Sequence, residues 1–325
     1  MEILRRNFLH LAAGAIALPA VSSVALAQTY PTRPVRLIVG FPPGGPVDIV
    51  ARIMGQWLSE RLGQPFVIEN RGGAAGNVAT EVVVRALPDG YTLLQSNVSN
   101  AINATLYEKL NFNFLTDLVS VAGIQTTPGV VVVNPSFQAK SIPELIAYAK
   151  VNPGKVNMAS GGNGSVNHVY GELFKMMAGV NMLHVPYRGG GPALTDLISG
   201  VVHVSFSPVP ASIEYIKTGK LRALAVTTAT RVEVLPETPT IADFLPGYAA
   251  NGWQGISAPR NTPADIVDRL NREINAGLAD ARVRARIADL GGTGLPGSPA
   301  DFAKFVVDDT EKWAKVVKFS GAKPD

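Results

Sequence analysis

Three glycine-rich segments contain the residues of this chain that are best suited to binding an anion. They read FPPGGP at 41–46, SGGNGS at 160–165 and YRGGGP at 187–192. Glycine lets successive main-chain N–H groups turn toward one point, and the N-terminus of a following helix adds a partial positive charge. Each segment therefore suits a carboxylate. A tight strand-to-helix turn explains any single segment equally well, because glycine is the usual turn residue.

Polar residues near these segments have two interpretations each. Asp48 falls in the first turn of a predicted helix, where its carboxylate either complements the helix dipole or contacts a ligand. Arg188 is the one cation within a glycine segment, and it either pairs with a carboxylate or points to solvent. His168 either lines a cleft or packs in the core. The predicted strand 91–94 is followed by a group of polar residues that either donate hydrogen bonds to a ligand or cap a helix. They are Ser96, Asn97, Ser99 and Asn100.

Signatures of enzymes and metal sites are missing from the sequence. There is no cysteine, which excludes disulfides, thiolate nucleophiles and cysteine zinc sites. The GTGLPG run at 292–297 matches a dinucleotide-binding pattern, but it follows a predicted helix instead of a strand. His168, His184 and His203 lack metal-ligand spacing, and Asp308 with Asp309 is interpreted as a solvated helix face. The sequence predicts no catalytic residue, metal or cofactor.

The elements that position the glycine segments alternate between strand and helix patterns. Strands are predicted at 35–39, 66–68, 91–94, 130–133, 156–159, 183–185, 203–206, 221–226 and 255–258. Helices are predicted at 47–62, 75–87, 142–150, 193–198, 211–217, 263–277, 281–290 and 299–319. Such alternation predicts parallel sheets covered by helices. Each glycine segment follows a strand, at the sheet edge where ligands bind in α/β folds.

The length and composition favour two globular domains. The chain has 325 residues, 46% of them hydrophobic and 17% charged, with a net charge of +4. Because the basic residues are scattered, a nucleic-acid groove is not expected. Gly, Pro and Thr gather at 123–129, and two glycines fall within 250–255. We interpret both segments as crossings between domains. The prediction is one domain of 28–125 plus 253–325 and a second of 126–252.

The first 27 residues have the pattern of an export signal. Arg5 and Arg6 precede an apolar run at 11–18, and a small-residue site ends at Ala27. The paired arginines resemble a twin-arginine signal, and an ordinary Sec peptide is the alternative. Cleavage before Gln28 predicts a periplasmic protein.

Seven stretches, in order along the chain, resemble the Bug-type substrate-binding proteins of the tripartite tricarboxylate transporter family. They are GFPPGGPVDIVAR (40–52), VIENRGGAAGN (67–77), PDGYTLL (88–94), SGGNGSVNHVYGELFK (160–175), VPYRGGGPALTDLISG (185–200), GKLRALAVT (219–227) and EKWAKVVK (311–318). The resemblance implies a two-domain α/β Venus-flytrap fold of the periplasmic-binding-protein type (type II). It also implies that main-chain amides and water hold a small carboxylate.

The resemblance transfers a set of site residues to this chain. They are Phe41, Pro42, Gly44, Gly45, Asp48, Gly161, Gly164, Ser165, His168 and, as a wall, Tyr187. Ser96 and Ser207 are added as side-chain candidates. Many members carry Asp where this chain has Ser207, so the expected ligand is a plain or aromatic carboxylate in preference to an amino acid.

The function predicted from these observations is a monomeric periplasmic receptor that delivers a carboxylate to permease subunits or to a sensor. An exported hydrolase or isomerase on the same scaffold is one alternative. The effector half of a transcription regulator is the other, and the export signal argues against it.

Overall fold

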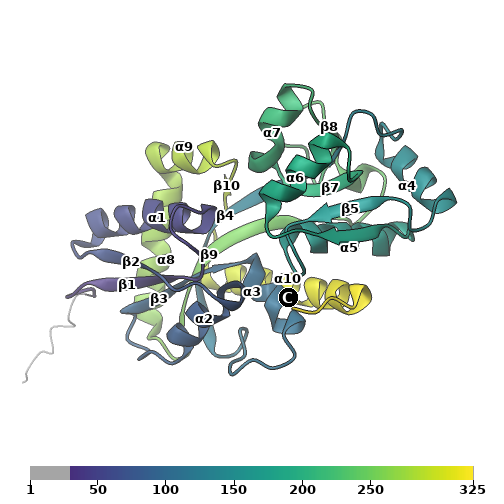
Figure 1. Cartoon of the computed structure of the whole chain (residues 1–325). Helices are drawn as coiled ribbons and strands as arrows, with labels where there is room; N and C mark the ends of the chain where they lie inside the picture. The colour runs from purple at the N-terminus through teal and green to yellow at the C-terminus, as the bar shows by residue number, and fades with distance from the viewer. Residues whose placement is uncertain (1–29, 325) are drawn as a thin grey trace, which may run out of the picture.

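The structure is a computed structural model that describes residues 30–324 as two α/β lobes sharing one long strand (Figure 1). The predicted export signal lies outside the described residues. Lobe one contains β1 (Val35–Val39), α1 (Pro46–Leu62), β2 (Phe66–Asn70), η1 (Ala74–Gly76), α2 (Asn77–Val84), β3 (Thr92–Asn97), α3 (Val98–Leu106), β9 (Asn251–Pro259), α8 (Ala264–Ala279), α9 (Ala281–Asp289), β10 (Thr293–Gly294) and α10 (Pro299–Ser320). Lobe two contains α4 (Ile142–Val151), β5 (Asn157–Ser160), α5 (Val166–Ala178), β6 (Leu183–Pro186), α6 (Gly190–Ser199), β7 (Val204–Pro208), α7 (Val209–Lys217), β8 (Arg222–Val226) and η2 (Ile241–Asp243). The shared strand is β4 (Leu118–Val133).

The strands form one continuous path in the order β2-β1-β3-β9-β4-β7-β5-β6. The pairs β1/β2, β1/β3, β5/β6 and β5/β7 are parallel, as expected for strands connected through helices. By contrast, β9 runs antiparallel to both β3 and β4, and β4 runs antiparallel to β7 and β8. The predicted parallel-rich α/β architecture is therefore confirmed, with antiparallel strands at its centre.

The segment at 123–129 lies within β4 and does not form a loop. Residues 118–128 of β4 pair with β9, whereas residues 129–133 pair with β7 and β8 of lobe two. Glycine is needed here for close packing, because a side chain on Gly123 would overlap Leu295 and one on Gly129 would overlap Thr227. The chain thus passes between lobes through a paired strand. The exact domain boundaries given above stay a prediction.

Helix α10 packs against both lobes, since it contacts α3 and β4 as well as α5 of lobe two. In Figure 1 it runs in yellow from lobe one, behind α3, to a position below lobe two. Asp309 on this helix is only 5% exposed, so its interpretation as part of a solvated face is wrong. Its carboxylate accepts hydrogen bonds from the indole N–H groups of Trp253 and Trp313. Its neighbour Asp308 is exposed, as expected.

Capping residues fix the ends of two helices that the sequence predicted. Helix α1 ends at Gly63, whose φ of 71° is left-handed, and α4 begins after Ser141, whose hydroxyl accepts the Glu144 N–H. Helix α3 was not predicted, and α2 is shorter than the predicted helix at 75–87. Within residues 30–324, the structure has no helix long and apolar enough to cross a membrane.

Candidate functional site

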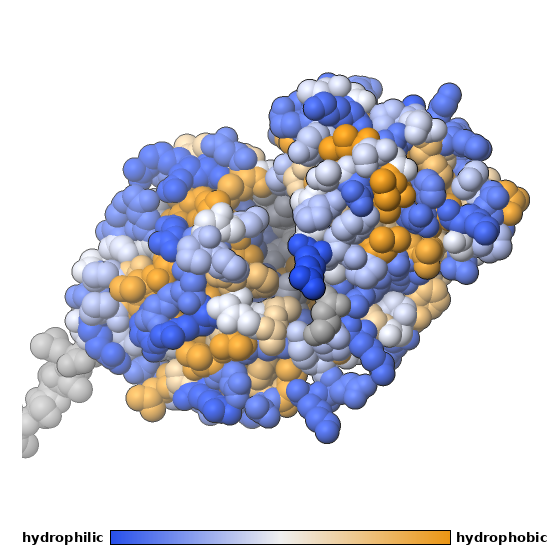
Figure 2. All heavy atoms as spheres, viewed as in Figure 1, coloured by the Kyte–Doolittle hydropathy of each residue, from blue (hydrophilic) through white to orange (hydrophobic). Residues whose placement is uncertain are grey.

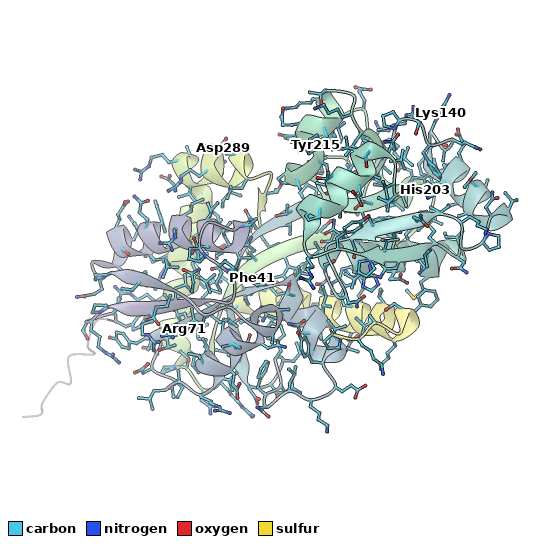
Figure 3. All side chains as sticks on the ribbon, in the orientation of Figure 1. Phe41, Arg71, Lys140, His203, Tyr215 and Asp289 are labelled. Carbon is cyan, nitrogen blue, oxygen red and sulfur yellow. The ribbon has the colours of Figure 1, made fainter. Side chains whose placement is uncertain are left out.

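A cleft of about 780 Å³ lies between the two lobes. Figure 2 shows the surface hollowed between the lobes, and Figure 3 shows Phe41 near the centre of the molecule, where lobe one faces that hollow. The cleft is lined by Phe41, Gly44, Pro46, Val47, Ile49, Asn97, Val98, Ser99, Gln125, Thr127, Pro128, Val166, Tyr170, Gly190, Pro208, Pro210, Ala211, Gly252, Trp253, Gln254, Asp289 and Leu290.

Five helices begin at this cleft. Helices α1 and α3 of lobe one, and α5, α6 and α7 of lobe two, each contribute residues of their first turn or their N-cap to its lining. The main-chain N–H groups of Val47, Val98 and Val166 find no acceptor among the described residues. First-turn N–H groups point outward along the helix axis, where the helix dipole is positive. The cleft therefore presents amide donors and partial positive charge from both lobes.

The lining carries almost no formal charge. Among the described residues that line the cleft, none is Lys, Arg or His, and the one carboxylate is that of Asp289 at the end of α9. Asp289 is exposed, and Figure 3 shows it on α9 at the edge of lobe one. Apolar and aromatic side chains make up much of the remaining wall, including Phe41, Val166 and Trp253. Such a site suits an anion with an organic body better than a bare polyanion.

The first glycine segment is shaped by the buried carboxylate of Asp48. Its Oδ2 accepts the Gly44 N–H at 2.8 Å and Arg52 Nε at 2.8 Å, while its Oδ1 accepts Asn70 Nδ2 at 2.9 Å. Burial alone would raise the pKa of Asp48, but these hydrogen bonds outweigh it and lower the pKa to about 2. Asp48 is therefore ionised at neutral pH and holds the loop. With both oxygens engaged in this way, its structural role is the one that the geometry supports.

The second glycine segment is fixed by two stacked histidines. The rings of His168 and His184 are parallel within 10°, with centroids 3.8 Å apart. His168 Nδ1 accepts the Gly164 N–H at 3.1 Å, and His184 Nε2 lies 2.5 Å from Ser160 Oγ. Ser165 caps α5 by accepting the His168 N–H. His168, only 3% exposed, thus supports the segment from beneath.

A buried carboxylate completes this support. Glu172 Oε1 lies 3.6 Å from His168 Nε2 and 2.7 Å from Lys175 Nζ. Burial would raise the pKa of Glu172, but the contacts with His168 and Lys175 together hold the pKa below its usual value. The negative charge of Glu172 favours the proton of His168 on Nε2, which leaves Nδ1 free to accept the Gly164 N–H.

The third glycine segment is tied to the second. The Gly189 N–H donates to Gly161 O at 3.2 Å, and the Tyr187 hydroxyl donates to Asp196 Oδ2 at 2.7 Å. Burial and the Asp196 carboxylate raise the pKa of Tyr187 to about 12. Arg188 is exposed and does not line the cleft.

The predicted site residues differ in their distance from the cleft surface. Phe41 and Gly44 line the cleft, and Pro42 and Gly45 belong to the same segment. Gly161, Gly164 and Ser165 precede Val166, which lines it. Behind the surface lie Asp48, Ser96, His168 and Ser207, all buried. Ligand contact by these residues stays a prediction.

Several lining residues were missed from the sequence. Tyr170 belongs to an apolar stripe of α5, and Trp253 and Gln254 belong to β9. Their positions in the sequence predict buried core residues and give no sign of a cleft. Asn97 and Asn100 form a capping box at the start of α3, which favours the capping interpretation of the polar run at 96–100.

Within residues 30–324, no group of His, Asp and Glu side chains is arranged to hold a metal ion.

Comparison with known proteins assigns the family. Residues 50–321 match the profile of the tripartite tricarboxylate transporter family receptor. The chain belongs to this receptor family. It is 38% identical to protein BugT of Bordetella pertussis over 311 residues, which cover 95% of each chain. Membership confirms the prediction of a binding receptor over that of an exported enzyme.

Solved structures of relatives confirm the two-domain periplasmic-binding-protein fold. The R. palustris protein Rpa4515, solved with adipate, is 38% identical to this receptor over 91% of the chain and all of its own, with a TM-score of 0.77. MatC from Rhodopseudomonas palustris, solved with bound malate, is 32% identical over 89% of this chain and all of its own, with a TM-score of 0.74.

Proposed function

We propose that this receptor captures a small organic carboxylate in the cleft between its lobes and holds it with main-chain amides at helix N-termini. The observation that carries the proposal is the convergence of five helix starts on a cleft whose lining, within the part of the chain that the structure describes, has no cationic side chain. Hydrogen bonds to a charged group contribute about 1.5 to 3 kcal/mol each, and a helix terminus adds up to about 2 kcal/mol. A few such donors, with burial of the organic part, suffice for micromolar affinity, which corresponds to about 8 kcal/mol.

The proposed ligand is a plain carboxylate, aliphatic or aromatic, in preference to an amino acid. Binding an α-ammonium group requires an anion or several acceptors nearby. Ser207 in β7 is neutral, and the one carboxylate among the described lining residues, that of Asp289, is exposed at the end of α9. The adipate and malate in the two related structures are consistent with a carboxylate that lacks an amine.

Export to the periplasm and delivery to membrane permease subunits, or to a sensor, are parts of the same proposal. The paired Arg5 and Arg6 and the site before Gln28 support export. Family membership supports a transporter partner. Cell fractionation tests the first part: the protein should leave the cytoplasm, and changing both arginines to lysine should retain it there if the route is twin-arginine.

Thermal shift and calorimetry test the ligand class. The probes are adipate, malate, benzoate and glutamate, together with the methyl esters of the first three. We expect at least one acid to raise the melting temperature, because a ligand that binds only the native state stabilises it. Its ester should not, since esterification removes the charge. Equal binding of acid and ester, or binding of glutamate alone, would contradict the proposal.

A further inference from the structure

Tyr170, on α5, has an unusual combination of burial and an unused hydroxyl. The residue is 1% exposed and yet belongs to the lining of the cleft. Its Oη has no hydrogen-bond partner among the described residues, although a buried tyrosine hydroxyl normally has one. The buried Tyr30, by comparison, donates its hydroxyl to Gly90 O at 2.6 Å.

The ring of Tyr170 is held on several sides. It stacks on Trp313 of α10 with centroids 5.6 Å apart and planes 22° apart, and its main-chain oxygen accepts the Tyr248 hydroxyl at 2.9 Å. A methyl group on Gly129 would lie 3.2 Å from the ring carbon Cδ2, so β4 packs closely against the ring. The position of the hydroxyl is therefore fixed before any ligand arrives, which lowers the entropy lost on binding.

The hydroxyl lies at the floor of the cleft, where the two lobes meet. A methyl group on Gly252, another lining residue, would lie 3.7 Å from Tyr170 Oη. Gly252 pairs with Thr127 in the β4/β9 ladder that joins the lobes. Val166, whose free N–H opens α5, is one helical turn before Tyr170 on the same face. Val166 and Tyr170 therefore both line the same cleft.

The hydroxyl keeps its proton at any physiological pH. Burial, and then the negative charge of Asp309, raise the pKa of Tyr170 well above its ordinary value of 10. Tyr170 therefore offers a neutral O–H donor, which adds no charge to a cleft whose described lining residues include no Lys, Arg or His.

We propose that Tyr170 is a specificity-determining ligand contact that donates its hydroxyl hydrogen bond to an oxygen of the bound carboxylate. The inference rests on the proposed function and adds a side-chain donor to the main-chain donors of the helix starts. It also gives this receptor a means of discrimination, because a donor left without an acceptor in a buried site disfavours ligands that lack one.

The test is Tyr170→Phe, which removes one oxygen atom and leaves the ring in place. The probe is the acid among adipate, malate and benzoate that binds the wild-type protein most tightly in calorimetry. We expect the Kd to rise at least tenfold, as for the loss of a hydrogen bond to a charged group, with the melting temperature unchanged or raised. Tyr30→Phe is the matched control, since it removes a buried hydroxyl outside the cleft lining and should lower the melting temperature without changing the Kd.

A Kd for Tyr170→Phe within fivefold of the wild-type value would overturn the inference while leaving the proposed function intact. Failure of all three acids to bind the wild-type protein would instead overturn the proposed function, and the role of Tyr170 with it. A rise in Kd of equal size in Tyr30→Phe would also count against the inference, because it would mark a general effect of losing a buried hydroxyl.

Discussion

The carboxylate of Asp48 accepts the main-chain N–H of Gly44, four residues earlier, at 2.8 Å. The same oxygen accepts Arg52 Nε, four residues later, so one buried side chain joins the first glycine segment to the first turns of α1. This relationship means that the Gly44 N–H is occupied in the structure. The donors left for a ligand are those that follow it at the helix start, such as the Val47 N–H.

Replacing Asp48 with asparagine should loosen the first glycine segment. The change removes the charge that Arg52 and Asn70 contact, and we expect the free energy of unfolding to fall by about 2 kcal/mol. Urea denaturation measures it. Asp265→Asn is the control, because Asp265 also lies in the first turn of a helix but is exposed. Equal losses of unfolding free energy in both variants would show that Asp48 stabilises the protein only by its charge near the N-terminus of α1.

The contribution of Asp48 should depend on pH in a defined direction. Its pKa in the folded protein is lowered to about 2 from an ordinary value of 3.8. A lowered folded-state pKa adds stability above the unfolded-state value and loses it as the pH falls through the folded-state value. The stability difference between wild type and Asp48→Asn should therefore stay constant between about pH 5 and 8 and shrink from about pH 4 toward 2. A difference that grew on acidification would contradict this sign.

A side chain at Gly44 should reduce ligand binding without unfolding the protein. Gly44 has a φ of 79° and open space where a Cβ would be added, so Gly44→Ala costs about 1 to 2 kcal/mol of backbone strain and places a methyl group in the cleft. Gly63→Ala is a matched control with a φ of 71°, equally open space and a position at the far end of α1. Calorimetry should show weaker carboxylate binding for Gly44→Ala alone. Equal affinities in the two variants would contradict ligand binding beside the first glycine segment.

Gly164 is less suitable for the same experiment. Its φ is 72°, but an added Cβ would overlap Leu106 of α3 in lobe one. A larger residue there should disturb the contact between lobes as well as the second glycine segment, so loss of binding would not isolate the cleft.

Glu172→Gln should destabilise lobe two. The wild-type carboxylate is 3% exposed and contacts His168 and Lys175, and its neutralisation should lower the free energy of unfolding by about 2 kcal/mol. Glu214→Gln is the control, because Glu214 pairs with Lys217 at the same spacing of three residues on the surface. That variant should differ from wild type by less than about 0.5 kcal/mol. Similar losses of unfolding free energy in both variants would contradict a special contribution of the buried Glu172 to the stability of lobe two.

Asp309→Ala should destabilise the packing of α10 against β9. The substitution leaves the indole N–H groups of Trp253 and Trp313 without their acceptor, which should cost about 3 kcal/mol. Denaturation followed by tryptophan fluorescence measures both the stability and the environment of the two rings. The adjacent Asp308→Ala removes only an exposed pair with Lys304 and should be nearly neutral. A neutral result for Asp309→Ala would show that the buried carboxylate contributes nothing to stability.

Local sequence patterns predicted the strand, glycine segment and helix units well, because their signals lie within a few residues of each other. Helix α1 begins at the end of the first glycine segment and ends at Leu62, in agreement with the predicted range 47–62. Helix α3 was missed because its sequence contains asparagines, which favour caps and turns. Its apolar residues still pack in the core.

The centre of the molecule could not be predicted from local patterns. Gly123 and Gly129 weaken the strand signal of β4, and the partner strand β9 lies more than 100 residues away in sequence. Tyr170 and Phe174 have the spacing of a buried helix stripe, and both are buried. That Tyr170 also faces a cleft depends on the position of Gly129 and Gly252, which only the folded chain brings together.

A crystal structure with a bound carboxylate tests the central claim most directly. The account predicts the carboxylate oxygens in the cleft within about 2.7 to 3.2 Å of main-chain nitrogens at helix starts, Val47 or Val166 among them, with no Lys or Arg side chain in contact. A carboxylate held by Arg188, or bound outside the cleft, would contradict it.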